Sequence, residues 1–243
     1  MNRPNSHNAP SVILVPGYWL GGWAWQDVTK HLVVAGMSAV AITLPGLESP
    51  TTPRDTISLA DHVRAIVDAV RAAGKPVVLV AHSGAGALAC AVLDEVPDLV
   101  DRVTYVDSGP VADGTVARPD LPASAVELPL PNWAELEAGG ASLAGLTEAM
   151  LRRFRDRAVP HPAGPLRQPV RLHNPARNRV PATIVCCSAP SGAVRQMAAG
   201  GTEMFAPLAD LTAADYVDLP TGHWPMWSEP AALAEVILAA VRD

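Results

Sequence analysis

The sequence Val80-Ala81-His82-Ser83-Gly84-Ala85-Gly86 decides the fold of this chain. An apolar run at residues 77–81 leads into it, and a helical pattern follows over about residues 84–96. A serine on a tight turn between a strand and a helix is typical of a nucleophile elbow, which lifts the hydroxyl above the edge of a sheet. We therefore predict that Ser83 is a nucleophile.

The residues around Ser83 are small enough for the closely spaced backbone of such a turn. Small residues are needed on both sides of the nucleophile because the backbone segments come close together. Ala81 and Ala85 stand where glycine is usual, and Gly84 follows the serine directly. The backbone N–H of Gly84 is then expected to point toward a developing oxyanion. The alternative is an ordinary turn rich in glycine and serine.

Outside this turn, short apolar runs alternate with helical patterns. Strands are predicted at residues 11–15, 38–44, 77–81, 103–106, 183–187 and 216–219. Helices are predicted at residues 23–35, between an N-cap at Ser58 and Gly74, at 84–96 and at 229–241. Continuous apolar strands separated by helices indicate a mostly parallel central sheet with helices on both faces. The predicted fold class is therefore α/β.

Residues 108–176 interrupt this alternation. The segment is rich in proline, shows no convincing strand and contains one charged helical pattern at about residues 146–157. A crossover between parallel strands needs far fewer than these ~70 residues, so we predict an inserted cap at the carboxyl edge of the sheet. The core then comprises residues 11–107 and 177–243. A long disordered loop is the alternative.

Composition argues against several classes of protein. Lys and Arg number 18 and Asp and Glu number 24, and the net charge of −6 argues against nucleic-acid binding. No apolar stretch reaches the ~18 residues of a transmembrane helix. Residues 1–10 are predicted to form a loose leader without the apolar part of a secretory signal.

The cysteines favour a reducing compartment. Cys90, Cys186 and Cys187 are too few for a disulfide framework in a chain of this size. No Cys/His spacing indicates a zinc site. We expect a cytoplasmic protein without metal or cofactor, and the sequence leaves the oligomeric state open.

A base for Ser83 is expected in the sequence Thr221-Gly222-His223-Trp224-Pro225, directly after the last predicted strand. A serine hydroxyl is a weak nucleophile until a base takes its proton. His223 can reach across the strand ends to Ser83, whereas His82 is expected to support the elbow. A purely structural histidine is the alternative.

The loop after the first strand, Pro16-Gly17-Tyr18-Trp19, offers a second donor to an oxyanion. Gly17 allows a close approach, and we predict that the backbone N–H of Tyr18 is the donor. Aromatic residues on this rim and in the inserted segment predict an apolar substrate pocket, and its candidates are Trp19, Trp133 and Trp224. Packing of the cap against the core is the other interpretation of these side chains.

Over nearly its whole length the chain resembles the α/β-hydrolase superfamily. Residues 12–25, VILVPGYWLGGWAW, are similar to the opening of the plant methylesterase and hydroxynitrile lyase branch. The resemblance implies Ser83 as nucleophile, His223 as base, and Tyr18 and Gly84 as oxyanion donors. The lyases of that branch need a Lys directly after the histidine, where this chain has Trp224, so cyanohydrin cleavage is disfavoured.

The acid departs from the pattern that this resemblance implies. Most members carry it after the penultimate strand, but residues 189–202 contain no Asp or Glu. Asp107 ends the strand at 103–106, one α/β unit after Ser83, where haloalkane dehalogenases and certain lactonases of the superfamily keep their acid. We predict a Ser83–His223–Asp107 triad, with loss of the acid as the alternative. A serine nucleophile argues against dehalogenation.

The predicted function is that of a cofactor-free serine hydrolase acting on a small or medium apolar carboxylic ester or lactone. A C–C bond hydrolase with the same triad is one alternative. A ligand-binding pseudo-hydrolase is another, because the acid is displaced. The expected partner is a small-molecule substrate, and we expect neither nucleic acid nor membrane as a partner.

Overall fold

A six-stranded parallel sheet organises the structure, a computed structural model that describes residues 11–74 and 76–242. The strand order is β2-β1-β3-β4-β7-β8, and every neighbouring pair is parallel. The strands are β1 (Ser11–Val15), β2 (Ser38–Ala41), β3 (Val77–His82), β4 (Val100–Val106), β7 (Ala182–Cys186) and β8 (Ala214–Asp218). The predicted α/β fold is confirmed, whereas the predicted leader lies outside the described residues.

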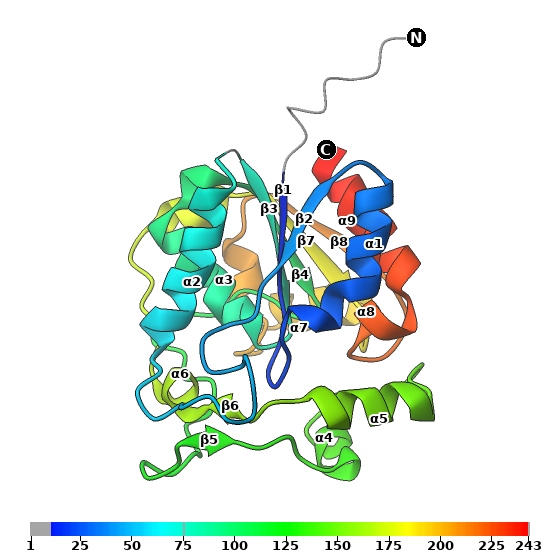
Figure 1. Cartoon of the computed structure of the whole chain (residues 1–243). Helices are drawn as coiled ribbons and strands as arrows, with labels where there is room; N and C mark the ends of the chain where they lie inside the picture. Colours follow the sequence, from blue (N-terminus) through cyan, green and yellow to red (C-terminus); the bar gives the residue numbers. More distant parts are fainter. Residues whose placement is uncertain (1–10, 75, 243) are drawn as a thin grey trace.

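Helices cover both faces of the sheet (Figure 1). One face carries α1 (Gln26–Val34), α8 (Pro225–Ser228) and α9 (Pro230–Arg242), and the other carries α2 (Leu59–Ala72), α3 (Ala85–Glu95) and α7 (Ser191–Ala199). Because side chains alternate along a strand, Ile13 packs into one core and Leu14 into the other. Short 3-10 turns lie at Gly22–Trp25, Pro97–Leu99, Pro175–Arg179 and Ala206–Asp210.

Two helices show how local and distant residues define helix ends. The predicted N-cap at Ser58 is confirmed, because Ser58 and Asp61 form a capping box. The sequence does not predict α7, whose N-cap Pro190 makes no side-chain hydrogen bond. Its first amide, Ser191 N, donates to Asp218 Oδ1 at 2.6 Å, so the cap is supplied from β8.

The inserted segment predicted at residues 108–176 lies between β4 and β7, beyond the carboxyl ends of the strands (Figure 1). The prediction of a single helix is wrong, because the segment also forms a short antiparallel strand pair and further short helices. Its elements are β5 (Glu127–Leu128), α4 (Trp133–Ala138), α5 (Glu148–Arg157), β6 (His161–Pro162) and α6 (Ala163–Arg167). Phe154 of α5 is fully buried against Trp224 and Trp227 of the core.

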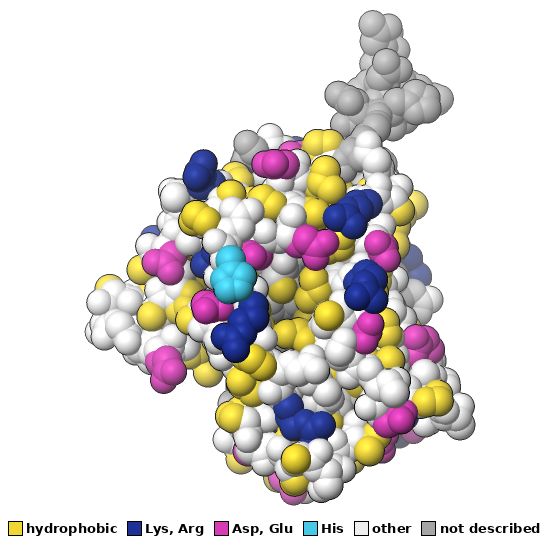
Figure 2. Space-filling model, turned by 90° about the vertical axis from the view of Figure 1, so that its left-hand side faces the viewer, with side chains coloured by type: hydrophobic (Ala, Val, Ile, Leu, Met, Phe, Trp, Pro, Cys, Tyr) yellow, Lys and Arg dark blue, Asp and Glu magenta, His cyan; other side chains and the backbone are white. Residues whose placement is uncertain are grey.

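Charged side chains of both signs are interspersed on the face shown in Figure 2. Lys and Arg lie among Asp, Glu and hydrophobic side chains there, so this face carries no continuous basic patch. Within the described residues, no helix combines the length and the apolar character that crossing a membrane requires.

Candidate active site

Ser83 occupies a strained turn between β3 and α3. Its φ of 54° lies in the left-handed region, which a residue with a Cβ adopts only when the surrounding structure enforces it. Ser83 N donates to Val106 O at 3.1 Å, and Gly86 N donates to Ser83 O at 3.0 Å. A Cβ on Gly86 would lie 2.4 Å from Ser108 Oγ, so this turn needs the glycine.

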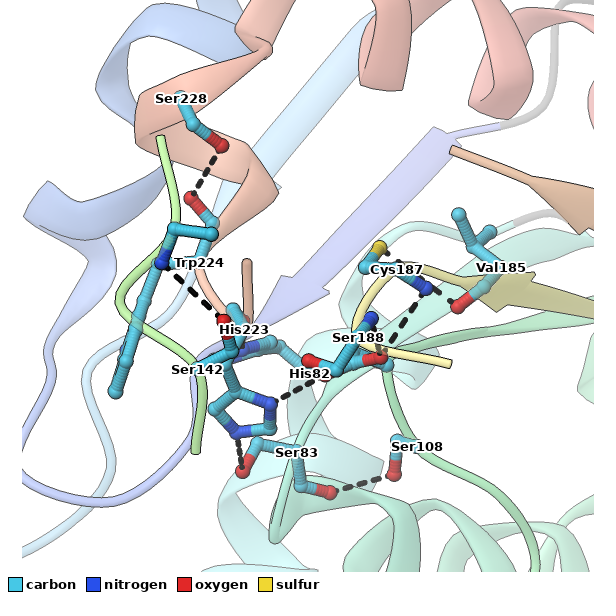
Figure 3. Close-up of polar contacts among 12 residues, drawn as sticks. His82, Ser83, Ser108, Ser142, Val185, Cys187, Ser188, His223, Trp224 and Ser228 are labelled. Atoms are coloured by element: carbon cyan, nitrogen blue, oxygen red, sulfur yellow. Dashed lines mark hydrogen bonds and ion pairs between the residues drawn. The ribbon is translucent and has the colours of Figure 1, made fainter. Parts of the chain in front are cut away.

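Three strand ends bring Ser83, His223 and Asp107 together. Figure 3 shows the His223 ring pointing toward Ser83. Ser83 follows β3, Asp107 follows β4, and His223 follows β8. His223 Nε2 lies 2.7 Å from Ser83 Oγ, and His223 Nδ1 lies 2.5 Å from Asp107 Oδ2. Hydrogen bonds in this order can pass the hydroxyl proton to the imidazole while the carboxylate orients the ring.

The carboxylate of Asp107 is held by the loop that follows β7. Asp107 has a φ of 43°, and its Oδ1 accepts hydrogen bonds from Cys187 N at 3.1 Å and Ser188 N at 2.9 Å. Ser188 Oγ donates to Oδ2 at 2.6 Å. Burial raises the pKa of this carboxyl, but the hydrogen bonds and charge of His223 and the hydrogen bonds from Ser188 outweigh burial and hold the pKa below its usual range. Asp107 is therefore ionised at neutral pH.

His82 supports the loop that carries His223. Its Nε2–H donates to His223 O at 2.7 Å, in line with the expected supporting role. Burial lowers the pKa of His82 to about 3, so the ring is neutral at physiological pH. A Cβ on Gly17 would lie 2.9 Å from His82 Nδ1, so this glycine lets the first loop approach the elbow.

Buried histidines make the fold sensitive to acid. Burial lowers the pKa of His62, His82 and His161, so the unfolded chain takes up these protons near pH ~6.5 and the folded chain does not. Stability is then fully present above this pH and is lost as the pH falls. As the pH falls from ~6.5 to ~5, the loss of unfolding free energy in urea experiments is expected to approach about 1.4 kcal/mol per pH unit for each of His82 and His161, whose pKa values are lowered most.

A variant pair separates this effect from general acid denaturation. His161→Phe is expected to lower the number of protons taken up on unfolding by about one, and so to reduce the slope of the unfolding free energy against pH. His173→Phe, at an exposed position, is expected to leave this slope unchanged. A stability that does not change with pH over this range contradicts the assignment of neutral buried imidazoles.

The inserted segment holds the backbone of the His223 loop. His223 N donates to Ser142 O at 2.8 Å, and Gly222 N donates to Ala144 O at 3.1 Å. A Cβ on Gly222 would lie 2.4 Å from Ala144 O and 2.6 Å from Ser142 O. Glycine at this position therefore lets the two segments pair closely.

Gly222→Ala is expected to lower kcat/KM by about a hundredfold, because a shift of ~1 Å in the position of a reacting group can cost that much. Steady-state kinetics and thermal unfolding are the measurements. Gly192→Ala in α7 is the matched control, because nothing lies within 4 Å of its added Cβ. Full activity of Gly222→Ala would show that this pairing does not position His223.

Tyr18 and Gly84 lie against each other beside the elbow. Among the hydrogen bonds of the described residues, neither the Tyr18 nor the Gly84 backbone N–H has an acceptor, so both amides are free to bind an oxyanion. The Tyr18 ring covers Gly84 so closely that an added Cβ would lie 2.2 Å from its Cζ. Burial raises the pKa of Tyr18 to about 12, so the phenol stays protonated.

A small cavity adjoins Tyr18 and Gly84, and the structure does not bring Trp19, Trp133 or Trp224 to it. Trp19 Nε1 donates to Leu128 O at 2.9 Å. The rings of Trp133 and Trp224 lie 5.5 Å and 5.2 Å from that of Phe154. These tryptophans therefore pack the inserted segment on the core, and a substrate contact remains a prediction for them.

Metal-ligating residues do not cluster in the described part of the chain. Residues 11–74 and 76–242 contain no group of three or more His, Cys, Asp or Glu side chains that could hold a metal ion. Cys90, Cys186 and Cys187 are free and buried. The expectation that the reaction needs no metal remains a prediction.

Some contacts of the site are missing from the sequence interpretation. Ser188, which holds Asp107, and Ser142 and Ala144, which hold the His223 loop, belong to no predicted motif. Of these three residues, only Ser188 could have been found from the sequence, because it follows β7, where the resemblance places an acid.

Comparison with known proteins agrees with this fold. The sequence profile of the alpha/beta hydrolase family matches residues 12–236. The chain is 30% identical to Methylesterase 7 of Arabidopsis thaliana over 106 residues, 42% of this chain and 41% of the relative. It is 28% identical to a carbendazim hydrolyzing esterase of Nocardioides sp. (strain SG-4G) over 98 residues, 40% of each protein. The chain thus matches about two fifths of the length of these relatives.

Solved structures extend the likeness to nearly the whole chain. An extracellular alpha/beta-hydrolase from a Paenibacillus species superposes with a TM-score of 0.73 at 19% identity, covering 96% of this chain and 100% of that one. A methylesterase from Arabidopsis gives a TM-score of 0.72 at 16% identity, covering 96% of this chain and 99% of that one. These identities show a shared fold alone. Since the family profile extends from β1 into α9, the chain belongs to the alpha/beta hydrolase family, as its resemblance in sequence predicts.

Proposed function

We propose that this protein is a serine esterase that hydrolyses a small or medium apolar carboxylic ester or lactone. The observation that carries the proposal is the continuous hydrogen-bond chain from Ser83 Oγ through His223 to Asp107. The esterase names of the relatives, a methylesterase and a carbendazim hydrolyzing esterase, support the reaction class.

The proposed reaction proceeds through an acyl-enzyme. His223 Nε2 takes the proton of Ser83 Oγ as the oxygen attacks the ester carbonyl. The backbone N–H groups of Tyr18 and Gly84 stabilise the oxyanion that forms. The protonated His223 then gives its proton to the departing alkoxide, and the alcohol leaves. His223 then takes a proton from a water molecule that attacks the acyl-enzyme carbonyl. As the bond between Ser83 Oγ and the acyl carbon breaks, His223 returns this proton to Ser83 Oγ and the carboxylic acid leaves.

Asp107 contributes charge and orientation to these steps. Its Oδ2 accepts from His223 Nδ1, which fixes the tautomer that presents Nε2 to Ser83. The ionised carboxylate also stabilises the imidazolium that forms during attack. We further propose that the inserted segment acts as a cap over this site, and that the reaction needs neither metal nor cofactor.

The neighbours of the triad argue against two other activities of the superfamily. Trp224 follows His223, so no lysine is present there to stabilise a cyanide leaving group. Ser83 replaces the aspartate that dehalogenation needs as nucleophile. We propose a cytoplasmic protein whose partner is a small-molecule substrate and not a nucleic acid or a membrane.

A labelled fluorophosphonate and a panel of p-nitrophenyl esters and lactones of graded chain length test the function. Fluorophosphonates phosphonylate a serine only when a base activates it, so labelling is expected to map to Ser83 by peptide mass spectrometry. Release of nitrophenol is expected for short and medium acyl chains. A protein that is neither labelled nor active would instead be a ligand-binding pseudo-hydrolase.

A further inference from the structure

Three residues other than glycine adopt a positive φ within residues 11–74 and 76–242. Two of them, Ser83 and Asp107, belong to the proposed triad. The third is Trp19, whose φ is 64°. A bulky residue in this left-handed region is strained, and the strain persists only where the surrounding structure enforces it. Because strained residues cluster at functional sites, Trp19 is a candidate for a functional role.

Trp19 directly follows the proposed oxyanion donor Tyr18 in the loop after β1. On the other side of this donor, Gly17 packs on the nucleophile turn, because an added Cβ there would lie 3.0 Å from Ser83 Cβ. The Tyr18 ring lies against Gly84, which carries the second proposed donor. The backbone N–H of Tyr18 is therefore flanked by a residue that contacts the nucleophile turn and by Trp19.

Two parts of the inserted segment hold Trp19. Its Nε1 donates to Leu128 O of β5 at 2.9 Å, and Val159 N, which follows α5, donates to Trp19 O at 3.0 Å. The Trp19 side chain is only 8% exposed, so water competes little for the indole N–H. The ring and the carbonyl group of Trp19 are thus both tied to the inserted segment.

These anchors restrict rotation of the backbone next to Tyr18. Rotation about the N–Cα bond of Trp19 has to move either the groups that follow this bond, which the inserted segment holds, or the peptide group of Tyr18 that precedes it. With the ring and the carbonyl group of Trp19 fixed, Tyr18 keeps one position beside the nucleophile turn. A displacement of ~1 Å in a catalytic group can cost about a hundredfold in rate, so an oxyanion donor benefits from this restriction.

We propose that Trp19 is a positioning residue for the oxyanion site: the inserted segment holds it in the left-handed conformation and thereby aims the backbone N–H of Tyr18 at the carbonyl oxygen of the substrate. The proposal rests on the proposed esterase function. It gives the inserted segment a part in catalysis, because Leu128 and Val159 supply the two anchors.

Trp19→Phe tests the first anchor, because it keeps an aromatic ring but removes the indole N–H. An interaction made only in the transition state contributes to kcat and not to KM. We therefore expect kcat for a p-nitrophenyl ester to fall by at least about tenfold with KM unchanged. Thermal unfolding and circular dichroism establish that the variant is folded.

Trp227→Phe is the matched control for this substitution. Trp227 is 6% exposed, and its Nε1 donates to Ala24 O at 3.0 Å, in the 3-10 turn at Gly22–Trp25. The control therefore loses the same kind of hydrogen bond at a similar burial, but outside the oxyanion loop. It is expected to lose thermal stability as Trp19→Phe does and to keep kcat.

Val159→Pro tests the second anchor from the inserted segment, because proline lacks the N–H that donates to Trp19 O. It is also expected to lower kcat by at least about tenfold, and Trp19→Phe/Val159→Pro by no more than roughly a thousandfold, because one oxyanion donor is affected. Val159→Ala retains the N–H and is expected to keep kcat.

Inhibition by an alkylboronic acid measures the oxyanion site directly. Ser83 Oγ adds to boron while His223 takes the hydroxyl proton, and the tetrahedral anion that forms imitates the reaction intermediate. The inhibition constant is expected to rise in Trp19→Phe and Val159→Pro by the factor by which kcat falls. The primary alcohol of the same chain length forms no anion and is expected to bind the wild type and both variants alike.

The outcomes separate this proposal from the proposed function. Unchanged kcat and unchanged boronic acid inhibition in Trp19→Phe and Val159→Pro overturn the positioning role and leave the esterase standing, as does an equal loss of kcat in Trp227→Phe. An increase in KM alone would make Trp19 a substrate contact and would also overturn the positioning role. A wild type that neither hydrolyses esters nor binds the boronic acid refutes the esterase, and the positioning role with it.

Discussion

Ser83→Ala is expected to lower kcat for ester hydrolysis by roughly a millionfold while the protein stays folded. The hydroxyl is the atom that attacks, and without it His223 Nε2 loses the partner that lies at 2.7 Å. Alanine fits the same turn, because serine already tolerates the φ of 54° there. Active-site titration, steady-state kinetics and thermal unfolding together measure both parts of this expectation.

Ser191→Ala is the matched control for this experiment. Ser191 also follows a strand and is hydrogen-bonded, but its partner is Asp218 on β8 and not a histidine. It is expected to leave kcat unchanged. Retention of more than about a tenth of the activity by Ser83→Ala would exclude Ser83 as the nucleophile, because loss of a nucleophile costs several orders of magnitude.

Asp107→Asn is expected to lower kcat by about ten-thousandfold. The amide cannot stabilise the imidazolium, and its NH₂ group favours the tautomer of His223 that no longer accepts the proton of Ser83. Circular dichroism and thermal unfolding check that the fold survives. Full activity of this variant would remove Asp107 from the proposed triad and leave the Ser83–His223 pair standing.

The double variant Asp107→Asn/Ser188→Asp tests whether the acid can move to the next strand end. Ser188 Oγ lies 2.6 Å from Asp107 Oδ2, the atom that accepts from His223. A carboxylate introduced at position 188 can therefore approach the imidazole, and we expect it to restore activity at least about tenfold over Asp107→Asn. Asp107→Asn/Ser188→Asn carries no charge at either place and is expected to restore nothing.

The sequence predicts the turn that carries Ser83 and the strand ends that carry Asp107 and His223, because each depends on a pattern of adjacent residues. A strand, a tight turn and a helix are encoded by adjacent residues, and the structure places Ser83 on that turn. The absence of an acid at residues 189–202 directs attention to Asp107, and the structure brings Asp107 to His223. The catalytic roles of these residues stay predictions until the variants are measured.

Contacts between distant segments explain what the sequence does not predict. Helix α7 begins on a cap that Asp218 supplies from another strand, so its own residues carry no start signal. His161 meets Tyr18 and His62 only after the inserted segment folds back on the core. Trp19, Trp133 and Trp224 contact residues of distant segments that the sequence pattern does not reveal, because composition reports an aromatic side chain but not its direction.

The backbone pairing of Ser142 and Ala144 with the His223 loop also constrains how this enzyme can be re-engineered. Exchange of the inserted segment for that of a relative is an attractive route to new specificity, because the segment forms one continuous insertion in the chain. A chimera whose backbone does not place two carbonyl groups beside the His223 loop would deprive this loop of the hydrogen bonds that hold it. A successful graft therefore has to retain residues 142–144 of the host together with Gly222.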